Sequence, residues 1–595
     1  MNKKNITSFI IASLISFSFI VDLNINNLID VSSNKNLLYL ALVIFIFKFY
    51  KKYNEKNIYF GFKLLAFLFS IFMIFGYSYD KLNSWDFVFG NNIFIIISIF
   101  KFIGFYSFFK ILINLIYNFI KNIKFKNIKN KLLDKFNKKP LLYSGIIILL
   151  CWLPYIISFY PVILSPDPTN QIKQFYGIPT RYIDGINLVN EDVLITNDNP
   201  ILHTLLLGGT MNIGHSIGND NLGLFIYSII QISILLGALL YSIKHLMKNK
   251  VPSHLIFITV IIYALVPIFP LYSMSAVKDV IFSSFMLIFV VKLYDFIRYQ
   301  NISKKDYVML TLISLAVCLS RNNGIYHILL SLPFSIFFIK KEWFKIILVT
   351  VISTGIYLLF VNSLPYFQIT PGNKREMYSI PFQQTARYVK YYGDELTPYE
   401  RDVIDKLLVL DTLAERYNPE KSDAVKNKFN ALATDDEFNE YLKVWFYQFL
   451  KHPSVYLEAT INNVYGYFYP NTSKWYIYYK EYNRINETGK FNYHYNNLDT
   501  GRNILVGFGQ AFKKLPVIGL YVNIGFVVWI YLFMLIYLIK EKLNKYIVVL
   551  LPALSLILVC VASPVNTYFR YALPYIVSLP AVALLLYSAS KKLNW

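Results

Sequence analysis

The sequence is poor in cysteine, glycine and charge. Its 595 residues include only three cysteines and 24 glycines, and 16% of them are charged. Three cysteines exclude a disulfide framework and a zinc site built from cysteine. The sequence contains no GxxxxGK[ST], GxGxxG, HExxH or GxSxG motif, which excludes the common soluble-enzyme signatures. A charged share this far below the usual ~25% also excludes a string of soluble domains.

Apolar and aromatic residues are abundant instead. Hydrophobic residues make up 56% of the chain and aromatic residues 18%, which excludes a disordered chain. The net charge of +23 is unevenly placed, because residues 363–515 carry nearly equal numbers of acidic and basic residues. The other basic residues cluster in short gaps between apolar runs, as in the cytoplasmic loops of membrane proteins. We therefore expect a lipid bilayer, and no nucleic acid, as the partner of the basic surface.

Apolar runs long enough to cross a bilayer recur along the chain. A spanning helix needs about 20 mostly apolar residues. The expected fold is an all-α polytopic membrane protein with about 14 transmembrane helices and a mainly helical extracytoplasmic domain. Lys101 is the one charge expected well inside a run. The runs lie near residues 8–23, 37–53, 58–78, 92–114, 143–164, 220–243, 254–273, 279–297, 307–321, 324–340, 344–362, 516–539, 546–563 and 569–590.

The gaps between these runs predict the orientation. Residues 120–140 contain eight lysines and one acidic residue, and shorter basic gaps follow at 244–250, 298–305 and 540–545. With 14 spans, all of these gaps fall on one side, which the positive-inside rule assigns to the cytoplasm. We expect a multi-pass protein of the bacterial cell membrane with both termini cytoplasmic. The N-terminal run has no small-x-small cleavage site and is expected to remain as an anchor.

Four regions follow from this organisation. Residues 1–140 form an N-terminal module of about four spans with a basic cytoplasmic linker, and 141–362 form a transmembrane core whose first outer loop is 165–219. Residues 363–515 form the extracytoplasmic domain, and 516–595 form the C-terminal spans. Capping-box patterns at Thr397–Glu400 and Thr434–Glu437 predict helix starts within the outer domain.

Polar clusters mark the outer ends of several spans. Asp167 lies between Pro166 and Pro168, where the stiff backbone should keep it out of a helix. A carboxylate there could accept a proton from a substrate hydroxyl or bind a divalent cation, although it could equally cap a helix. Asp198 and His203 precede a short apolar stretch that we expect to lie along the outer surface, and they are candidates for acid–base or ligand roles.

Three further clusters share the same predicted face. Lys278 and Asp279 form a turn between two spans, Arg321 and Asn322 form another, and Arg570 opens the last span. Lysine and arginine in a cleft could hold phosphate. Each cluster alone is also consistent with a solvated pair or with a side chain at the membrane interface.

These clusters resemble those of the GT-C superfamily of polytopic membrane glycosyltransferases. The resemblance covers about residues 143–590 and includes Asp167 in a long first outer loop, Asn199-Pro200-Ile201-Leu202-His203, and Arg570 with Tyr571 and Pro574. The segments Gln383-Gln384-Thr385-Ala386-Arg387 and His452-Pro453-Ser454-Val455-Tyr456-Leu457 are similar to an uncharacterised bacterial branch within or near that superfamily. The first four spans look like an added module.

The resemblance implies a polyprenyl-phosphate-linked sugar donor and a glycan, lipid or protein acceptor at the outer face. It implies that Asp167 orients or deprotonates the acceptor and that Asp279 matches a second acidic site, and Asp198 is a further catalytic candidate. The cofactor is left open; a divalent cation, Mg²⁺ or Mn²⁺, could bind Asp167 and Asp279. The implied substrate-binding residues are Gln171, His203, Lys278, Arg321, Asn322, Gln384, Arg387 and Arg570. Many such enzymes carry an acidic pair at the first site, whereas Asp167 stands alone.

Two other functions remain open from the sequence. A transporter or flippase of lipid-linked glycans would place charges near the bilayer middle or show two related halves, but the charges here lie mainly at span ends. A non-catalytic envelope protein would use the outer domain to bind a partner. The acidic cluster of Asp167, Asp198 and Asp279 favours the transferase.

Overall fold

The computed structural model describes residues 3–24, 28–30, 35–55, 57–123, 125, 128, 130–180, 182–183, 188–299, 302–373, 375, 377–471, 474, 476–477, 484–563 and 565–591. The described chain is mostly α-helical, and its one sheet is an antiparallel pair of three-residue strands, β1 (Asp22–Asn24) and β2 (Leu28–Asp30). The all-α prediction is confirmed for this part of the chain. The extreme termini and three linker lysines, Lys124, Lys126 and Lys129, lie outside the described residues.

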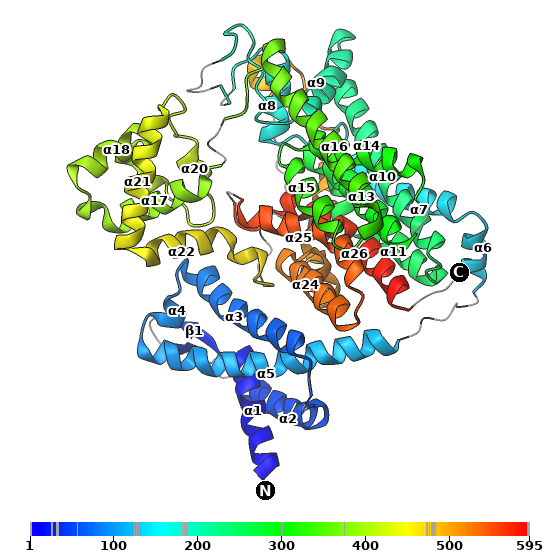
Figure 1. Cartoon of the computed structure of the whole chain (residues 1–595), viewed down its shortest axis with the longest axis vertical. Coiled ribbons are helices and arrows are strands. Elements are labelled where there is room, and N and C mark those ends of the chain that lie inside the picture. The colour runs from blue at the N-terminus through cyan, green and yellow to red at the C-terminus, as the bar shows by residue number, and fades with distance from the viewer. Residues whose placement is uncertain are drawn as a thin grey trace.

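The N-terminal module packs as a small helical group at one end of the molecule (Figure 1). Its helix α1 approaches α5 closely at Gly104, where an added Cβ would lie 2.3 Å from the carbonyl oxygen of Leu14. The module consists of α1 (Lys3–Ile20), α2 (Lys35–Tyr53), α3 (Phe60–Leu82), α4 (Asp86–Phe89) and α5 (Asn92–Asn122), followed by linker helix α6 (Lys131–Lys138).

The core is built around α13, which is buried along almost its whole length and packs on α10, α14 and α26. An all-round apolar helix needs such a central position. The core helices are α7 (Pro140–Ser158), α8 (Pro166–Phe175), α9 (Ile201–Ser216), α10 (Asp220–Lys248), α11 (Ser253–Leu265), α12 (Ile268–Ser273), α13 (Lys278–Arg298), α14 (Lys304–Ser320), α15 (Gly324–Ser335) and α16 (Trp343–Ser363), with α24 (Ile524–Lys540), α25 (Ile547–Val561) and α26 (Phe569–Ser590).

The predicted outer domain forms a separate lobe, in which Figure 1 shows α17, α18, α20, α21 and α22 grouped together. The lobe has its own apolar core. Both predicted capping boxes are present, at Thr397 with Glu400 and at Thr434 with Glu437. The lobe contains α17 (Ser379–Tyr392), α18 (Pro398–Leu408), α19 (Leu413–Arg416), α20 (Asp423–Lys426), α21 (Asp435–Lys451) and α22 (Pro453–Val464), and α23 (Asp499–Phe512) follows it.

Each of the 14 apolar runs coincides with helix, but not always with one long helix. The run at 254–273 is divided into α11 and α12, because Pro267 cannot continue the hydrogen bonding of α11. Eight described helices are long and apolar enough to cross a membrane, and four shorter apolar helices accompany them. The eight lie at Phe60–Leu82, Asn92–Asn122, Pro140–Ser158, Asp220–Lys248, Lys278–Arg298, Trp343–Phe367, Asn544–Val561 and Phe569–Ser590.

The predicted sidedness can be tested with one cysteine on each of the two predicted faces of the core. Asp192 lies exposed in the loop after α8, and Lys305 lies exposed just beyond the C-terminal end of α13. In intact cells, we expect a membrane-impermeant maleimide to label Asp192→Cys but not Lys305→Cys, which should react only after permeabilisation. Labelling of both variants in intact cells would contradict the orientation. The unmodified chain is the background control, because Cys318 and Cys560 are buried and Cys151 is only partly exposed.

Candidate functional site: a charged cavity at the ends of α13, α15 and α26

A cavity of about 500 Å³ lies where α13, α15 and α26 begin, and it falls within the ~300–1,000 Å³ usual for small-ligand sites. Segments far apart in the sequence meet there, including α8, the loop before α9 and part of the outer lobe. Its charged and amide-bearing lining residues are Asp167, Asp198, Asn199, Lys278, Arg321, Asn322, Asn323, Arg375, Lys421, Asp423, Lys426, Asn427 and Arg570. Six of the eleven predicted site residues are thus brought together.

A chain of ion pairs runs along the wall of this cavity. Arg570 Nη2 lies 2.7 Å from Asp167 Oδ2, and its Nε lies 3.8 Å from Asp279 Oδ2. Arg321 Nη1 lies 2.7 Å from the other oxygen, Asp279 Oδ1. The Asp279 side chain is fully buried, so it depends on both arginines for compensation of its charge. Alternating charges therefore join α8, α13, α26 and the turn before α15.

Asp167 belongs to the first turn of α8, which corrects the prediction that it lies outside any helix. Ser165 precedes the helix, and Pro166 occupies a first-turn position. Prolines are tolerated there because the first backbone N–H groups of a helix have no intrahelical acceptor. The carboxylate points into the cavity and accepts a hydrogen bond of 3.0 Å from the Tyr182 hydroxyl. One helix turn thus fixes its position rigidly.

Asp198 lines the cavity but also holds the loop that carries it. Its Oδ2 accepts from Thr196 Oγ1 at 2.9 Å, and its Oδ1 accepts from the backbone N–H of Asn373 at 3.0 Å. Its neighbour Asn199 accepts a hydrogen bond from the ammonium group of Lys278, and Asn322 Nδ2 donates to the carbonyl of Asn197 at 2.6 Å. This geometry gives Asp198 a positioning role for the cavity wall.

His203 and Gln171 lie behind the cavity wall, outside its lining. The ring Nδ1 of His203 is 3.0 Å from Gln171 Oε1, and Nε2 is 2.8 Å from the Tyr227 hydroxyl. Gln171 Nε2 also donates to Thr204 Oγ1 at 2.9 Å. Burial, reinforced by the nearby Lys278 charge, lowers the pKa of His203 to about 3, so the ring is neutral at physiological pH. These residues hold α8, α9 and α10 together.

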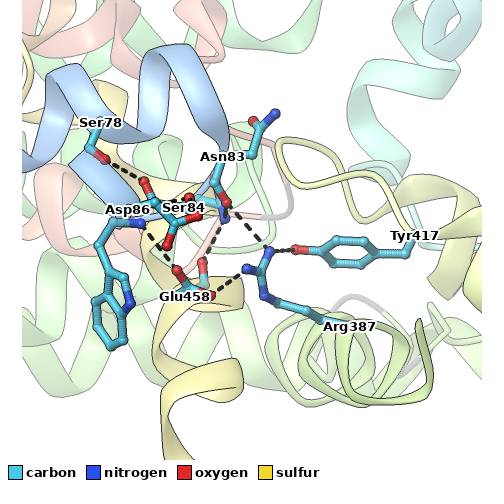
Figure 2. Close-up of polar contacts among 9 residues, drawn as sticks. Ser78, Asn83, Ser84, Asp86, Arg387, Tyr417 and Glu458 are labelled. Carbon is cyan, nitrogen blue, oxygen red and sulfur yellow. Dashed lines mark hydrogen bonds and ion pairs between the residues drawn. The ribbon is translucent and has the colours of Figure 1, made fainter. Parts of the chain in front are cut away.

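Gln384 and Arg387 lie in α17 of the outer lobe and do not line the cavity. Arg387 pairs with Glu458 and donates to the Tyr417 hydroxyl at 3.1 Å. Figure 2 shows that Glu458 also faces the turn between α3 and α4, where it accepts from the backbone N–H of Trp85 at 3.1 Å. Gln384 accepts from Trp445 Nε1 at 2.9 Å. Both side chains therefore hold the lobe together, and the Arg387–Glu458 pair ties it to the N-terminal module.

The outer lobe contributes to the cavity, which no sequence pattern predicted. Lys421 and Lys426 flank Asp423 at 3.3 and 3.1 Å, and all three line the cavity. They are brought there because the backbone N–H of Asn566 donates to the carbonyl of Glu420 at 2.9 Å. No motif marks these residues. A weak signal was the presence of three lysines and one aspartate within residues 421–428, in a lobe that is near neutral as a whole.

Counting charges gives the cavity a positive excess. Six basic side chains line it: Lys278, Arg321, Arg375, Lys421, Lys426 and Arg570. They face three lining carboxylates, together with the buried Asp279 behind them. Guanidinium and ammonium groups in a partly enclosed site are suited to phosphate oxygens. The cavity therefore favours an anionic ligand with polar groups.

The same contacts test the expectation of a divalent cation. Asp167 and Asp279 both face the guanidinium of Arg570, which lies between them. Within the described residues, no group of three or more His, Cys, Asp or Glu side chains converges as a metal site would require. These donors do not fit Mg²⁺ or Mn²⁺, so no step of the proposed reaction passes through a metal.

Comparison with protein families assigns the whole architecture to one group. The profile of a family of unknown function, DUF6020, matches residues 2–594. The chain belongs to the DUF6020 family. No curated protein and no solved structure matches it. The DUF6020 match includes the N-terminal helices and the outer lobe, so these regions belong to the family's common architecture together with the core.

The buried ion pairs predict a large effect of removing one partner. We expect Asp279→Ala to destabilise the protein by about 3–5 kcal/mol, because Arg321 would keep a buried charge without its carboxylate. The double variant Asp279→Leu/Arg321→Met should recover part of this loss, since it removes both charges. The measurement is the fraction of monodisperse protein after heating in detergent. Asp402→Ala, which breaks an exposed pair with Lys406, is the control and should change little. Unchanged thermal stability of Asp279→Ala would contradict this role.

Because His203 is buried in its neutral form, we expect the folded protein to lose stability in mild acid. The unfolded chain takes up a proton at this residue below its ordinary pKa of about 6.5, whereas the folded chain keeps the ring neutral down to about pH 3. Each pH unit below 6.5 should therefore cost up to ~1.4 kcal/mol. Between pH 7.5 and 5, the midpoint of thermal aggregation should fall more steeply for the natural protein than for His203→Gln. Parallel pH profiles would exclude this contribution.

Proposed function

We propose that the protein is an integral membrane glycosyltransferase that moves a sugar from a polyprenyl-phosphate donor to a glycan, lipid or protein acceptor at the outer face of the bacterial cell membrane. The observation that carries this proposal is the convergence of Asp167 with six basic side chains in one cavity at the ends of apolar helices. The proposal includes the 14 spans, the cytoplasmic termini and the extracytoplasmic position of the outer lobe.

The donor phosphate is assigned to the basic side of the cavity. Arg321 and Arg570 carry planar groups that can bind phosphate oxygens in pairs, and Lys278 adds a point charge. Arg321 is held by Asp279, Arg570 by Asp167, and Lys278 by Asn199. A phosphate would therefore meet preorganised cations, which lowers the cost of ordering them on binding.

A narrow slot next to Arg570 has a lining of the polarity that a lipid-linked donor would need. Ser165, Tyr568 and Arg570 line both the charged cavity and this slot. The remaining slot lining is mainly apolar and includes Ile163, Ile268, Leu271, Tyr272, Val277 and Ile477. The slot has a volume of only about 30 Å³, so the first part of a prenyl chain enters it only if the apolar side chains that line it move apart, with its phosphate on Arg570.

Asp167 is the proposed general base. The acceptor hydroxyl oxygen forms a bond to the anomeric carbon, the bond from that carbon to the phosphate oxygen breaks, and its electron pair stays on the phosphate. The hydroxyl proton passes to Asp167. In the free protein Arg570 stabilises the Asp167 carboxylate, and a phosphate that draws the guanidinium toward itself would leave Asp167 a stronger proton acceptor. Donor binding would thus activate the base.

The placement of charge favours transfer over transport. Lys278 and Asp279 begin α13, Arg570 lies at the start of α26, and Arg321 precedes α15. A transport pathway more often places ionisable groups or broken helices near the bilayer middle. The cavity instead gathers its charges at one end of the helix bundle, where a head group on the outer leaflet can be reached.

Replacement of the proposed base should abolish one envelope modification. We expect cells carrying Asp167→Asn to lose a glycan decoration that cells with the natural protein retain, as seen by mass spectrometry of envelope glycans. Rate losses for a removed general base are typically about 10²–10⁴-fold. Protein abundance in membranes should stay near normal, because asparagine can still accept from Tyr182.

The matched control is Asp192→Asn, which changes an exposed carboxylate in the loop that follows α8, outside the cavity lining. Its glycan profile should equal that of the natural protein. An unchanged profile for Asp167→Asn at normal abundance would overturn the assignment. Accumulation of the lipid-linked sugar at the inner leaflet in a deletion strain, with its outer-leaflet level depleted, would favour a flippase.

A further inference from the structure

A second cavity, of about 490 Å³, lies between the N-terminal module and the core. Its walls come from α1, α3 and α5, with Tyr469, Pro470 and Asn471 and two residues at the start of the C-terminal helices, Leu520 and Phe526. It shares no lining residue with the charged cavity. Its volume is again that of a small-ligand site.

One end of this cavity is polar and is dominated by Lys101. The Lys101 side chain is only 7% exposed, although it carries a positive charge. Its ammonium donates to the carbonyl of Val21 at 2.6 Å and lies 5.1 Å from the ring centre of Tyr77. An ammonium group has three N–H donors. Among the described residues Lys101 has no ion pair within 4 Å, but the carboxylate of Asp22, which is exposed on β1 and lines the same cavity, interacts electrostatically with it.

The other end is aromatic. Phe69 lies further along α3 than Tyr77, and Phe105 and Phe109 lie further along α5 than Lys101, measured from the turn between α3 and α4, and Phe19 packs against Phe105 and Phe109. Phe69 and Phe109 pack edge to face with ring centres 4.4 Å apart, and Phe19 and Phe105 do so at 5.2 Å. Phe19 is 45% exposed, so the aromatic end is reachable from the surrounding lipid.

We propose that this cavity binds a single-chain anionic amphiphile, with its carboxylate or phosphate head on Lys101 and its chain among the four phenylalanines. The polar end of the cavity matches the charged head of such a molecule, and the aromatic end matches its chain. An anionic head also stabilises the buried ammonium group of Lys101. The site is independent of the proposed glycosyl transfer, and it gives the N-terminal module a binding role of its own.

The depth of Lys101 agrees with this occupant. It lies about 14 Å along the helix axis from Asn92, the first residue of α5. The 31 residues of α5 extend for about 46 Å, more than the ~30 Å of hydrocarbon in a bilayer. With α5 as a span, Lys101 lies near the outer boundary of the hydrocarbon and the aromatic end lies toward the bilayer middle.

The experiment is photo-crosslinking of the purified full-length protein in mild detergent with a palmitate that carries a diazirine near its chain end. We expect crosslinks in the peptides that contain Phe69, Phe105 or Phe109, identified by tandem mass spectrometry. Palmitate or hexadecyl phosphate should compete, and the better competitor identifies the head group. Hexadecanol, which has the same chain and no charge, should compete roughly tenfold less well.

The matched variants change one lysine of α5 at a time. Lys101→Met should reduce crosslinking about tenfold, Lys101→Arg should retain it, and Lys110→Met should leave it unchanged, because Lys110 lies outside the cavity lining. Equal competition by hexadecanol in the natural protein would overturn the proposal, and this arm does not depend on how the variants fold. Equal crosslinking of Lys101→Met would overturn it as well. The glycan profile of Asp167→Asn affects neither the hexadecanol competition nor the crosslinking of Lys101→Met, so the two proposals fail independently.

Discussion

The buried carboxylate of Asp279 is the point on which the arrangement of the core depends. It lies in the first turn of the central helix α13 and forms ion pairs with Arg321, which precedes α15, and with Arg570 of α26. Arg570 also pairs with Asp167 and so links Asp279 to α8. Charges of alternating sign fix the relative positions of four segments that share no sequence proximity. These ion pairs form only where the beginnings of α13 and α26 lie beside α8 and the turn before α15, so they fix the register of the helices together with the apolar packing along α13 and α26.

A second set of contacts fixes the outer lobe over the core. The Arg387–Glu458 pair joins the lobe to the turn between α3 and α4, and Asn462 Nδ2 donates to the carbonyl of Asn83 in the same turn at 2.7 Å. At its other side the lobe contacts the segment before α26 through Glu420 and Asn566. The lobe is therefore held both at the N-terminal module and beside the cavity. Lys421 and Lys426 thus line the cavity from a part of the lobe that is fixed at two places.

Much of the helical content was predictable, because the length of an apolar run and the lysines in the gaps between runs can be read from adjacent residues. All 14 apolar runs are helical, and the capping boxes at Thr397 and Thr434 start helices as predicted. Asp167, Lys278, Asp279, Arg321 and Arg570 could be grouped because each marks the end of an apolar run. Arg375 and Lys421 could not be, since they reach the cavity through the packing of the lobe. Gln384 and Arg387 were misassigned for the same reason: a short motif does not reveal which neighbour its side chains will meet.

The Asp167 prediction shows the limit of local rules. Two flanking prolines suggested an extended backbone, yet the first turn of a helix is the place where proline costs no hydrogen bond. Tyr182, fifteen positions along, holds the carboxylate from the loop that follows α8. That contact depends on how the loop folds back, which no pattern of residue types encodes.

The dimensions of the charged cavity carry a consequence for the proposed transfer. About 500 Å³, walled on one side by the braced lobe, is the volume of a small-ligand site and far less than that of an extended polymer. Under this proposal an acceptor glycan enters by its tip, and each reaction adds one unit at a terminus.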